Sequence, residues 1–130
     1  MIKTFKDLIV YQKAFRLAMR IFEITKDFPK IEQFSLTDQI RRSSRSVCVN
    51  IWESWRRRMY PAHFVSKLTD SDAEATETII WLDFSLECDY LGPIVHKKVF
   101  TGYEEIGKML GSMITSPEKF CYGDLFKKVK

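Results

Sequence analysis

Glycine and proline are scarce in this chain, at five and four of 130 residues. Turn-rich β folds use both residues heavily, so their scarcity argues against such a fold and favours long helices. The sequence also has no stretch that approaches the roughly 18 uncharged apolar residues of a membrane-spanning helix. We therefore expect no membrane partner.

Cysteine is sparse as well. Cys48, Cys88 and Cys121 are odd in number and lie far apart, without the close spacing of a zinc knuckle or a redox motif. Reduced thiols are the simplest interpretation. The first residues lack the continuous apolar run of a signal peptide. Both observations predict a cytoplasmic protein.

Residues that usually carry catalysis are few. His63 and His96 are the two histidines of the chain, and neither lies three residues after a glutamate, as the di-iron sites of helical bundles require. The sequence has no Gly-x-Ser-x-Gly elbow and no glycine-rich phosphate loop. Cys48 lies beside Arg45, which could lower the pKa of its thiol, but packing as a small buried hydrophobe is the alternative. We expect a non-enzyme without metal or cofactor.

The charge that is present is unevenly distributed. The formal net charge is +4 over the chain. Residues 33–60 hold six basic and two acidic side chains, whereas residues 61–91 hold one lysine and seven acids. Two neighbouring helices of opposite sign can attract each other within a subunit or between subunits.

Apolar periodicity predicts four helices, over residues 4–27, 36–60, 61–91 and 94–114. Phe28-Pro29, Gly92-Pro93 and Ser116-Pro117 mark helix ends, because the residue before a proline avoids the α region. Ser35 is the expected N-cap of the second helix. The length suits one domain. The prediction is an all-α protein: an up-down antiparallel four-helix bundle over residues 1–116, followed by a loosely ordered tail over residues 117–130.

Two of these helices carry more apolar surface than one core can bury. The first has two stripes at helical spacing, one from Leu8 to Phe22 and one from Val10 to Ile24, and the third has a second set from Trp81 to Leu91. A surface helix needs a single stripe. We therefore expect a homo-oligomer, because large exposed apolar surface marks an interface. Gly102, Gly107 and Gly111 lie within the fourth helix, where they are expected to permit close packing.

The second helix is rich in arginine and contains no lysine. Arg41, Arg42 and Arg45 lie near its middle, and Arg56, Arg57 and Arg58 lie at its end; Trp52, Trp55 and Tyr60 are close by in sequence. Planar arginines suit phosphates or carboxylates, and the aromatic rings could stack on bases. Three other roles compete with this one: stabilising the helix dipole, pairing with the acidic third helix, and packing in the core or between subunits.

Several ordered motifs resemble a known family. They are Phe5-Lys6-Asp7-Leu8 with Tyr11-Gln12-Lys13-Ala14, Gln39-Ile40-Arg41-Arg42-Ser43-Ser44, Ser46-Val47, Asn50-Ile51-Trp52-Glu53, Ser71-Asp72-Ala73-Glu74-Ala75, and Trp81-Leu82 through Leu91. The chain is similar over about residues 5–115 to the four-helix-bundle proteins related to the 23S ribosomal-RNA intervening-sequence protein. Ser54 stands where the family usually has glycine.

The resemblance implies a small bacterial bundle protein that assembles into a homopentameric ring and whose function is mostly undefined. It also implies that Gln39, Ser46, Asn50, Glu53 and Glu74 make structural or subunit contacts. Two hypotheses for function remain. One is a homo-oligomer that binds RNA or other nucleic acid through Arg41, Arg42, Arg45, Arg56, Arg57 and Arg58. The other is a scaffold or protein-interaction module whose arginines form structural salt bridges.

Overall fold

Four long helices make up the structure, a computed structural model that describes residues 1–122. They are α1 (Ile9–Thr25), α2 (Leu36–Arg56), α3 (Pro61–Glu87) and α4 (Pro93–Thr115), with three short 3-10 helices, η1 (Phe5–Asp7), η2 (Lys30–Glu32) and η3 (Pro117–Lys119). No strand occurs in residues 1–122, which confirms the all-α prediction. No helix in this range is long and apolar enough to cross a membrane.

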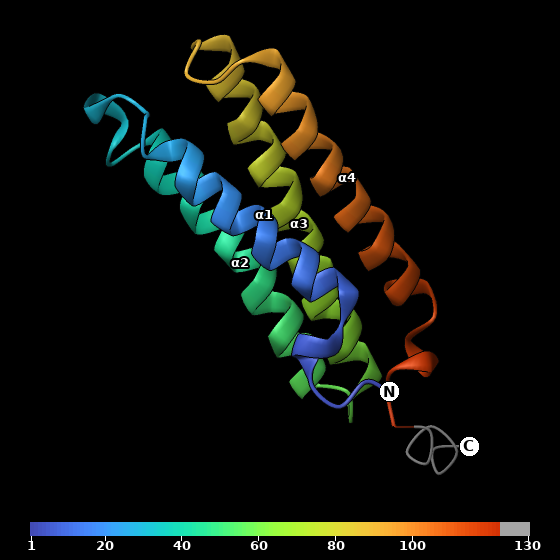
Figure 1. Cartoon of the computed structure of the whole chain (residues 1–130). Coiled ribbons are helices and arrows are strands. Elements are labelled where there is room, and N and C mark those ends of the chain that lie inside the picture. Colours follow the sequence, from blue (N-terminus) through green and yellow to red (C-terminus); the bar gives the residue numbers. More distant parts are fainter. Residues whose placement is uncertain (123–130) are drawn as a thin grey trace.

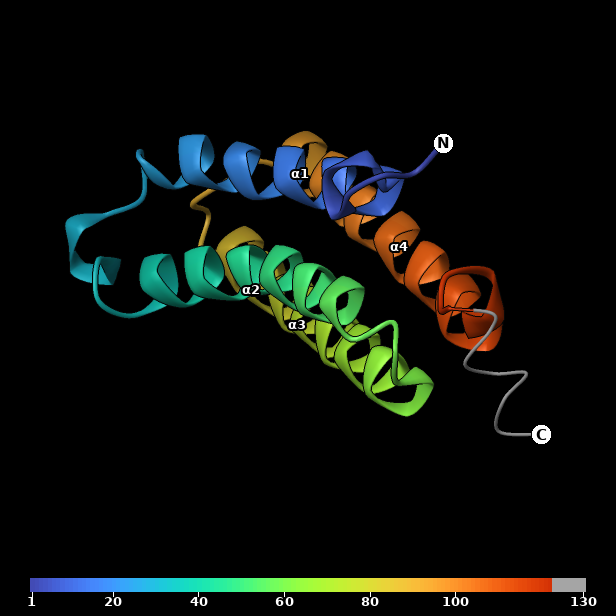
Figure 2. The same cartoon turned by 90° about the horizontal axis from the view of Figure 1, so that it is seen from below.

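Consecutive helices run in opposite directions and pack as two layers (Figures 1 and 2). Helices α1 and α4 form one layer, and α2 and α3 form the other. Each helix contacts its two neighbours, α1 with α2 and α4 and α3 with α2 and α4. The N-terminus, the junction between α2 and α3 and the end of α4 all gather at one end of the bundle.

Proline and glycine set the helix boundaries as the sequence predicts. Pro61 and Pro93 occupy first-turn positions of α3 and α4, where a missing backbone N–H leaves no hydrogen bond unmade. Helix α3 ends at Glu87, and two residues later Asp89 has a φ of 61°, in the left-handed region. The backbone N–H of Tyr90 then donates to the carbonyl of Ser85 at 2.9 Å, which closes the last turn.

The first helix begins later than its apolar pattern predicts. Leu8 is extended, with ψ of 126°, and separates η1 from α1. A capping box between Thr4 and Asp7 completes η1, and the backbone N–H groups of Lys3 and Thr4 lower the pKa of Asp7 by donating to its carboxylate. The extended residue places Leu8 in the core, where it is 4% exposed.

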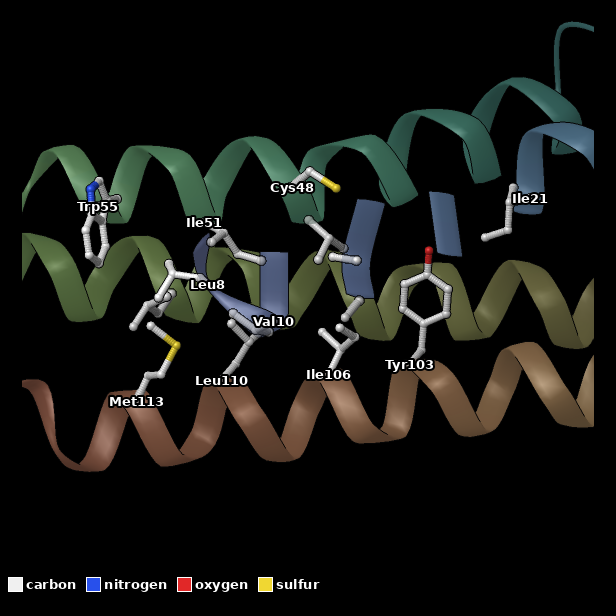
Figure 3. Packing of buried hydrophobic residues seen from close by; sticks show 14 of the residues in the cluster. Leu8, Val10, Ile21, Cys48, Ile51, Trp55, Tyr103, Ile106, Leu110 and Met113 are labelled. Atoms are coloured by element: carbon white, nitrogen blue, oxygen red, sulfur yellow. The ribbon is translucent and has the colours of Figure 1, made fainter. Parts of the chain in front are cut away.

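The core runs along the bundle axis and is filled from all four helices (Figure 3). Tyr103, Ile106, Leu110 and Met113 point from α4 toward α2, where Cys48, Ile51 and Trp55 meet them. Tyr103 is 1% exposed and is among the largest fully buried side chains. Burial of such apolar area is the main source of stability for the bundle.

Small polar residues lie at the contact between α2 and α3. Ser43 Oγ and Thr78 Oγ1 are 2.8 Å apart, and both residues are fully buried. Ser71 Oγ donates to the carbonyl of Val47 at 2.8 Å. Ser54 is also fully buried, so a small side chain is kept at the position where the family usually has glycine. Small residues here let the two helices approach closely.

The start of the expected tail packs on the bundle. The Phe120 ring stacks on Phe64 with 6.0 Å between centroids, and Cys121 is buried. The expectation for residues 123–130 lies outside the described residues.

Candidate nucleic-acid interface

Two of the three arginines near the middle of α2, Arg41 and Arg45, lie toward α1. Arg41 Nε donates to Thr25 Oγ1 at 2.8 Å, and its guanidinium lies 4.8 Å from the centroid of the Phe22 ring. Arg45 is exposed and lies 6.0 Å from the same ring. Arg41 therefore joins α2 to α1, while Arg45 reaches solvent.

Arg42 makes the contact with α3 that the charge contrast predicts. Its Nη1 lies 3.2 Å from Glu74 Oε2, and its Nη2 pairs with Glu77. Its Nε also donates to Gln39 Oε1 at 3.3 Å. Glu77 further accepts a hydrogen bond from the indole of Trp81. The Arg42 side chain is 48% exposed, so solvent screening limits each pair to about 0.2–1 kcal/mol.

The other motif residues are engaged along α2. Asn50 Nδ2 donates to the carbonyl and the hydroxyl of Ser46, at 3.0 and 3.2 Å. Glu53 forms an ion pair with Lys67 of α3 at 2.9 Å, and this hydrogen bond raises the pKa of the Lys67 ammonium. Glu53 and Glu74 thus belong to polar contacts between α2 and α3, whereas Gln39, Ser46 and Asn50 form hydrogen bonds within α2.

Arg58 is held by its neighbours at the end of α2. Its Nε donates to the carbonyl of Trp55 at 2.8 Å, and its guanidinium lies 3.6 Å from the Trp55 ring centroid. The ring of Tyr122 lies 5.1 Å away from the same guanidinium. The Tyr122 backbone N–H also approaches the carbonyl of Arg58, at 3.4 Å. Arg58 is therefore part of the link between the last described residues and α2.

Arg56 and Arg57 have a different environment. Both are exposed, and among residues 1–122 neither forms an ion pair. Trp52 lies one helical turn before Arg56 and is 41% exposed. Residues four apart share one face of a helix, so the indole and the guanidinium are presented together.

Two hollows flank this face. The first has a volume of about 340 Å³ and the second about 450 Å³. Trp52 and Arg56 line both. The first hollow has no acidic lining residue; it is completed by Lys3, Thr4, Phe5, Trp55, Arg58 and Tyr122. The second adds Glu53 and Arg57.

Sequence reasoning did not find four of these lining residues. Lys3, Thr4, Phe5 and Tyr122 are distant from α2 in sequence, and no sequence signal connects them with it. They meet it because the chain start and the end of α4 lie at the same end of the bundle (Figure 1). An up-down bundle with an even number of helices places both ends of the chain at the same end of the bundle. The sequence therefore predicts that the two ends are close, but not which of their residues contact α2.

The structure offers little for catalysis in the part of the chain that it describes. No group of three or more His, Cys, Asp or Glu side chains there could hold a metal ion. Burial raises the pKa of the Cys48 thiol to about 11, so Arg45 does not activate it. The packing interpretation of Cys48 is the one that the structure supports.

Comparisons with known proteins agree with this architecture. The family described as "23S rRNA-intervening sequence protein" matches residues 6–112. The chain is also similar to a solved structure, a protein of unknown function from the S23 ribosomal protein family of Bacteroides thetaiotaomicron. The two share 31% sequence identity and a TM-score of 0.76, over 85% of this chain and 98% of that one. No curated protein matches the chain. On its sequence and its four-helix fold, the chain belongs to the family of 23S rRNA-intervening sequence proteins.

Proposed function

We propose that this protein binds nucleic acid through the end of α2, at Arg56 and Arg57. The observation that carries the proposal is the exposure of these two guanidinium groups, without ion pairs among residues 1–122, beside the half-exposed Trp52. Guanidinium groups bind phosphates through paired hydrogen bonds. The helix dipole also favours cations at this end, by about 0.3–1 kcal/mol. That stabilisation accounts for the arginines but not for the exposed indole of Trp52 beside them.

The six arginines of the sequence hypothesis do not contribute equally to this proposal. Arg41 and Arg42 are assigned to helix contacts and Arg58 to the contact with Trp55 and Tyr122. Arg45 lies on a separate exposed part of α2 and could add one phosphate contact. Phosphate contacts give affinity with little base specificity, and the affinity falls as salt rises.

Self-association would multiply the interface. Exposed apolar side chains remain on α1 (Ile9, Phe15 and Met19) and on α3 (Ile80 and Phe84). These support the expectation of a homo-oligomer, for which the family resemblance implies a pentamer. Repeated copies of a weak binding site raise the overall affinity when one strand reaches several of them. Light scattering on the purified protein measures the number of subunits, and a monomer at micromolar concentration contradicts the expectation.

The second candidate function is a scaffold or protein-interaction module. The observation that favours a scaffold is the network of Arg42 with Gln39, Glu74 and Glu77. In this network an arginine of α2 forms structural ion pairs with α3 instead of remaining free for a phosphate. Arg56 and Arg57 are outside that network. The experiment that separates the two functions is therefore directed at them.

The test compares two double variants of equal charge change. Arg56→Gln/Arg57→Gln removes the proposed contacts, and Arg16→Gln/Arg20→Gln removes two exposed arginines of α1 as the matched control. Affinity for RNA and DNA is measured by mobility shift at about 50 and 200 mM salt. We expect the first variant to weaken binding and to reduce the slope of log K against log salt by about 0.7 for each lost contact on a single strand. An equal loss in the control contradicts the assignment of binding to Arg56 and Arg57, and absence of binding by the unaltered protein favours the scaffold.

A further inference from the structure

The two hollows beside Trp52 and Arg56 indicate which form of nucleic acid fits. We infer that the first hollow takes one unpaired base against Trp52, with the adjoining phosphate on Arg56, so that the ligand is single-stranded. This inference rests on the proposed function and deepens it. It concerns the kind of strand that is bound and not the identity of the base.

Trp52 is the aromatic side chain of α2 that is open to a ligand in the first hollow. Trp55 also lines the first hollow, but it is 7% exposed and the guanidinium of Arg58 covers its ring at 3.6 Å. Tyr122 is 46% exposed and forms a further part of the wall. A half-exposed indole beside a hollow can stack on any base, because every base has a π face.

The size of the first hollow suits a single planar group. Its volume of about 340 Å³ is at the lower end of the roughly 300–1,000 Å³ that small-ligand sites occupy. That space accepts a base that has left its stack. In a duplex the base faces are covered by their neighbours, so a duplex can offer this site only its phosphates.

The charge around the hollows matches the backbone of such a strand. The first hollow is lined by Lys3, Arg56 and Arg58 and by no acid. Arg56 also lines the second hollow, where Arg57 is the next cation and Glu53 is already paired with Lys67. A strand with one base on Trp52 would therefore meet Arg56 and then Arg57 as it continues into the second hollow.

The experiment measures fluorescence anisotropy of labelled oligonucleotides of about 12 nucleotides, within the usual range of single-strand sites. Oligouridine and oligothymidine serve as single strands, and each is also presented as a duplex with its complement. The variants are Trp52→Ala, Trp52→Phe and, as a control at an exposed aromatic just before the start of α2, Phe34→Ala.

We expect the single strands to bind more tightly than the duplexes. Trp52→Ala should weaken single-strand binding by roughly 5- to 150-fold, the range for loss of one base–aromatic stack, and leave duplex binding unchanged. Trp52→Phe should keep most of the affinity because a smaller aromatic face remains, and Phe34→Ala should change neither single-strand nor duplex binding. A difference between oligouridine and oligothymidine would add a preference for the sugar or for the C5 methyl group of thymine, and oligodeoxyuridine would separate the two.

Four results would overturn the inference. Equal affinity for single strands and duplexes, or an equal loss on both in Trp52→Ala, refutes it but leaves phosphate binding by Arg56 and Arg57 standing. Absence of binding to any of the oligonucleotides refutes the proposed function as well. A change in oligomer mass for Trp52→Ala by light scattering, restored in Trp52→Phe, assigns Trp52 to a subunit contact instead.

Discussion

The buried hydroxyl pair between α2 and α3 gives a quantitative test of how this bundle is held together. Thr78 Oγ1 donates to the carbonyl of Glu74 at 2.9 Å, so the hydrogen between Ser43 and Thr78 belongs to Ser43. Ser43→Ala removes that donor and leaves Thr78 with the bond that it donates. A buried neutral hydrogen bond contributes about 0.5–1.5 kcal/mol net, so we expect a loss of about 1 kcal/mol.

The helix propensity of alanine works in the opposite direction and must be separated. Ser66 is exposed on α3, so Ser66→Ala gives the propensity gain without a buried hydrogen bond. Relative to that control, Ser43→Ala should be about 1 kcal/mol less stable, or about 4 °C lower in Tm for a domain of this size. Urea unfolding followed by circular dichroism, at one fixed protein concentration, measures the difference.

The double variant isolates the pair itself. Thr78→Val keeps the shape of the side chain and removes its hydroxyl, which leaves the Ser43 hydroxyl only the carbonyl of Ile40 at 3.4 Å. Each single change should cost about 1 kcal/mol and the double change about the same, because a pair replaced on both sides leaves no hydroxyl unpaired. A coupling free energy below about 0.3 kcal/mol, within the range for independent sites, would refute the reasoning.

Two further predictions concern α4 and the core. Gly111→Ala should raise the free energy of unfolding by about 0.5–1 kcal/mol, because its Cβ would meet nothing within 4 Å. Gly102→Ala should lower the free energy of unfolding by about 1 kcal/mol, because its Cβ would lie 2.7 Å from Leu17. Urea unfolding of the two variants and the unaltered protein checks this order. The raised pKa of Cys48 means that the folded state keeps a proton that the unfolded state loses above about pH 9, so stability should fall between pH 9 and 11. Cys48→Ala should flatten that decline in chemical unfolding measured across this pH range, and an unchanged slope would contradict it.

The fold was accessible from the sequence because its signals are local. Pro61, Gly92 and Pro93 interrupt the chain where no helix can continue, and the apolar spacing between them leaves only helices to join. The apolar pattern did not predict that η1 and α1 are separate helices. An extended Leu8 and a helical Leu8 occupy the same position in the apolar spacing, so the pattern cannot distinguish them. Ser35 was expected to cap α2 with its side chain, but that hydroxyl lies 2.5 Å from Glu32 Oε1 instead.

The site was accessible only in part, because it depends on which residues the packing brings together. Arg42 and Arg56 are equally basic in sequence, yet Arg42 pairs with Glu74 and Glu77, whereas Arg56 forms no ion pair among residues 1–122. That difference depends on which residues of α3 lie opposite each arginine. The three glycines of α4 show the same limit: close packing holds at Gly102, but a Cβ at Gly107 would make an ordinary contact and one at Gly111 none.

The distribution of the three thiols gives the protein a built-in position for a reporter group. Cys88 is exposed, whereas Cys48 and Cys121 are buried. Cys88 follows the 27-residue helix α3, whose length of about 40 Å separates it from the end of the bundle where Trp52 and Arg56 lie. A dye attached to Cys88 leaves the proposed nucleic-acid interface untouched. In an assembly of copies, side-by-side parallel packing would place these dyes at one end, and antiparallel packing would alternate them along the axis.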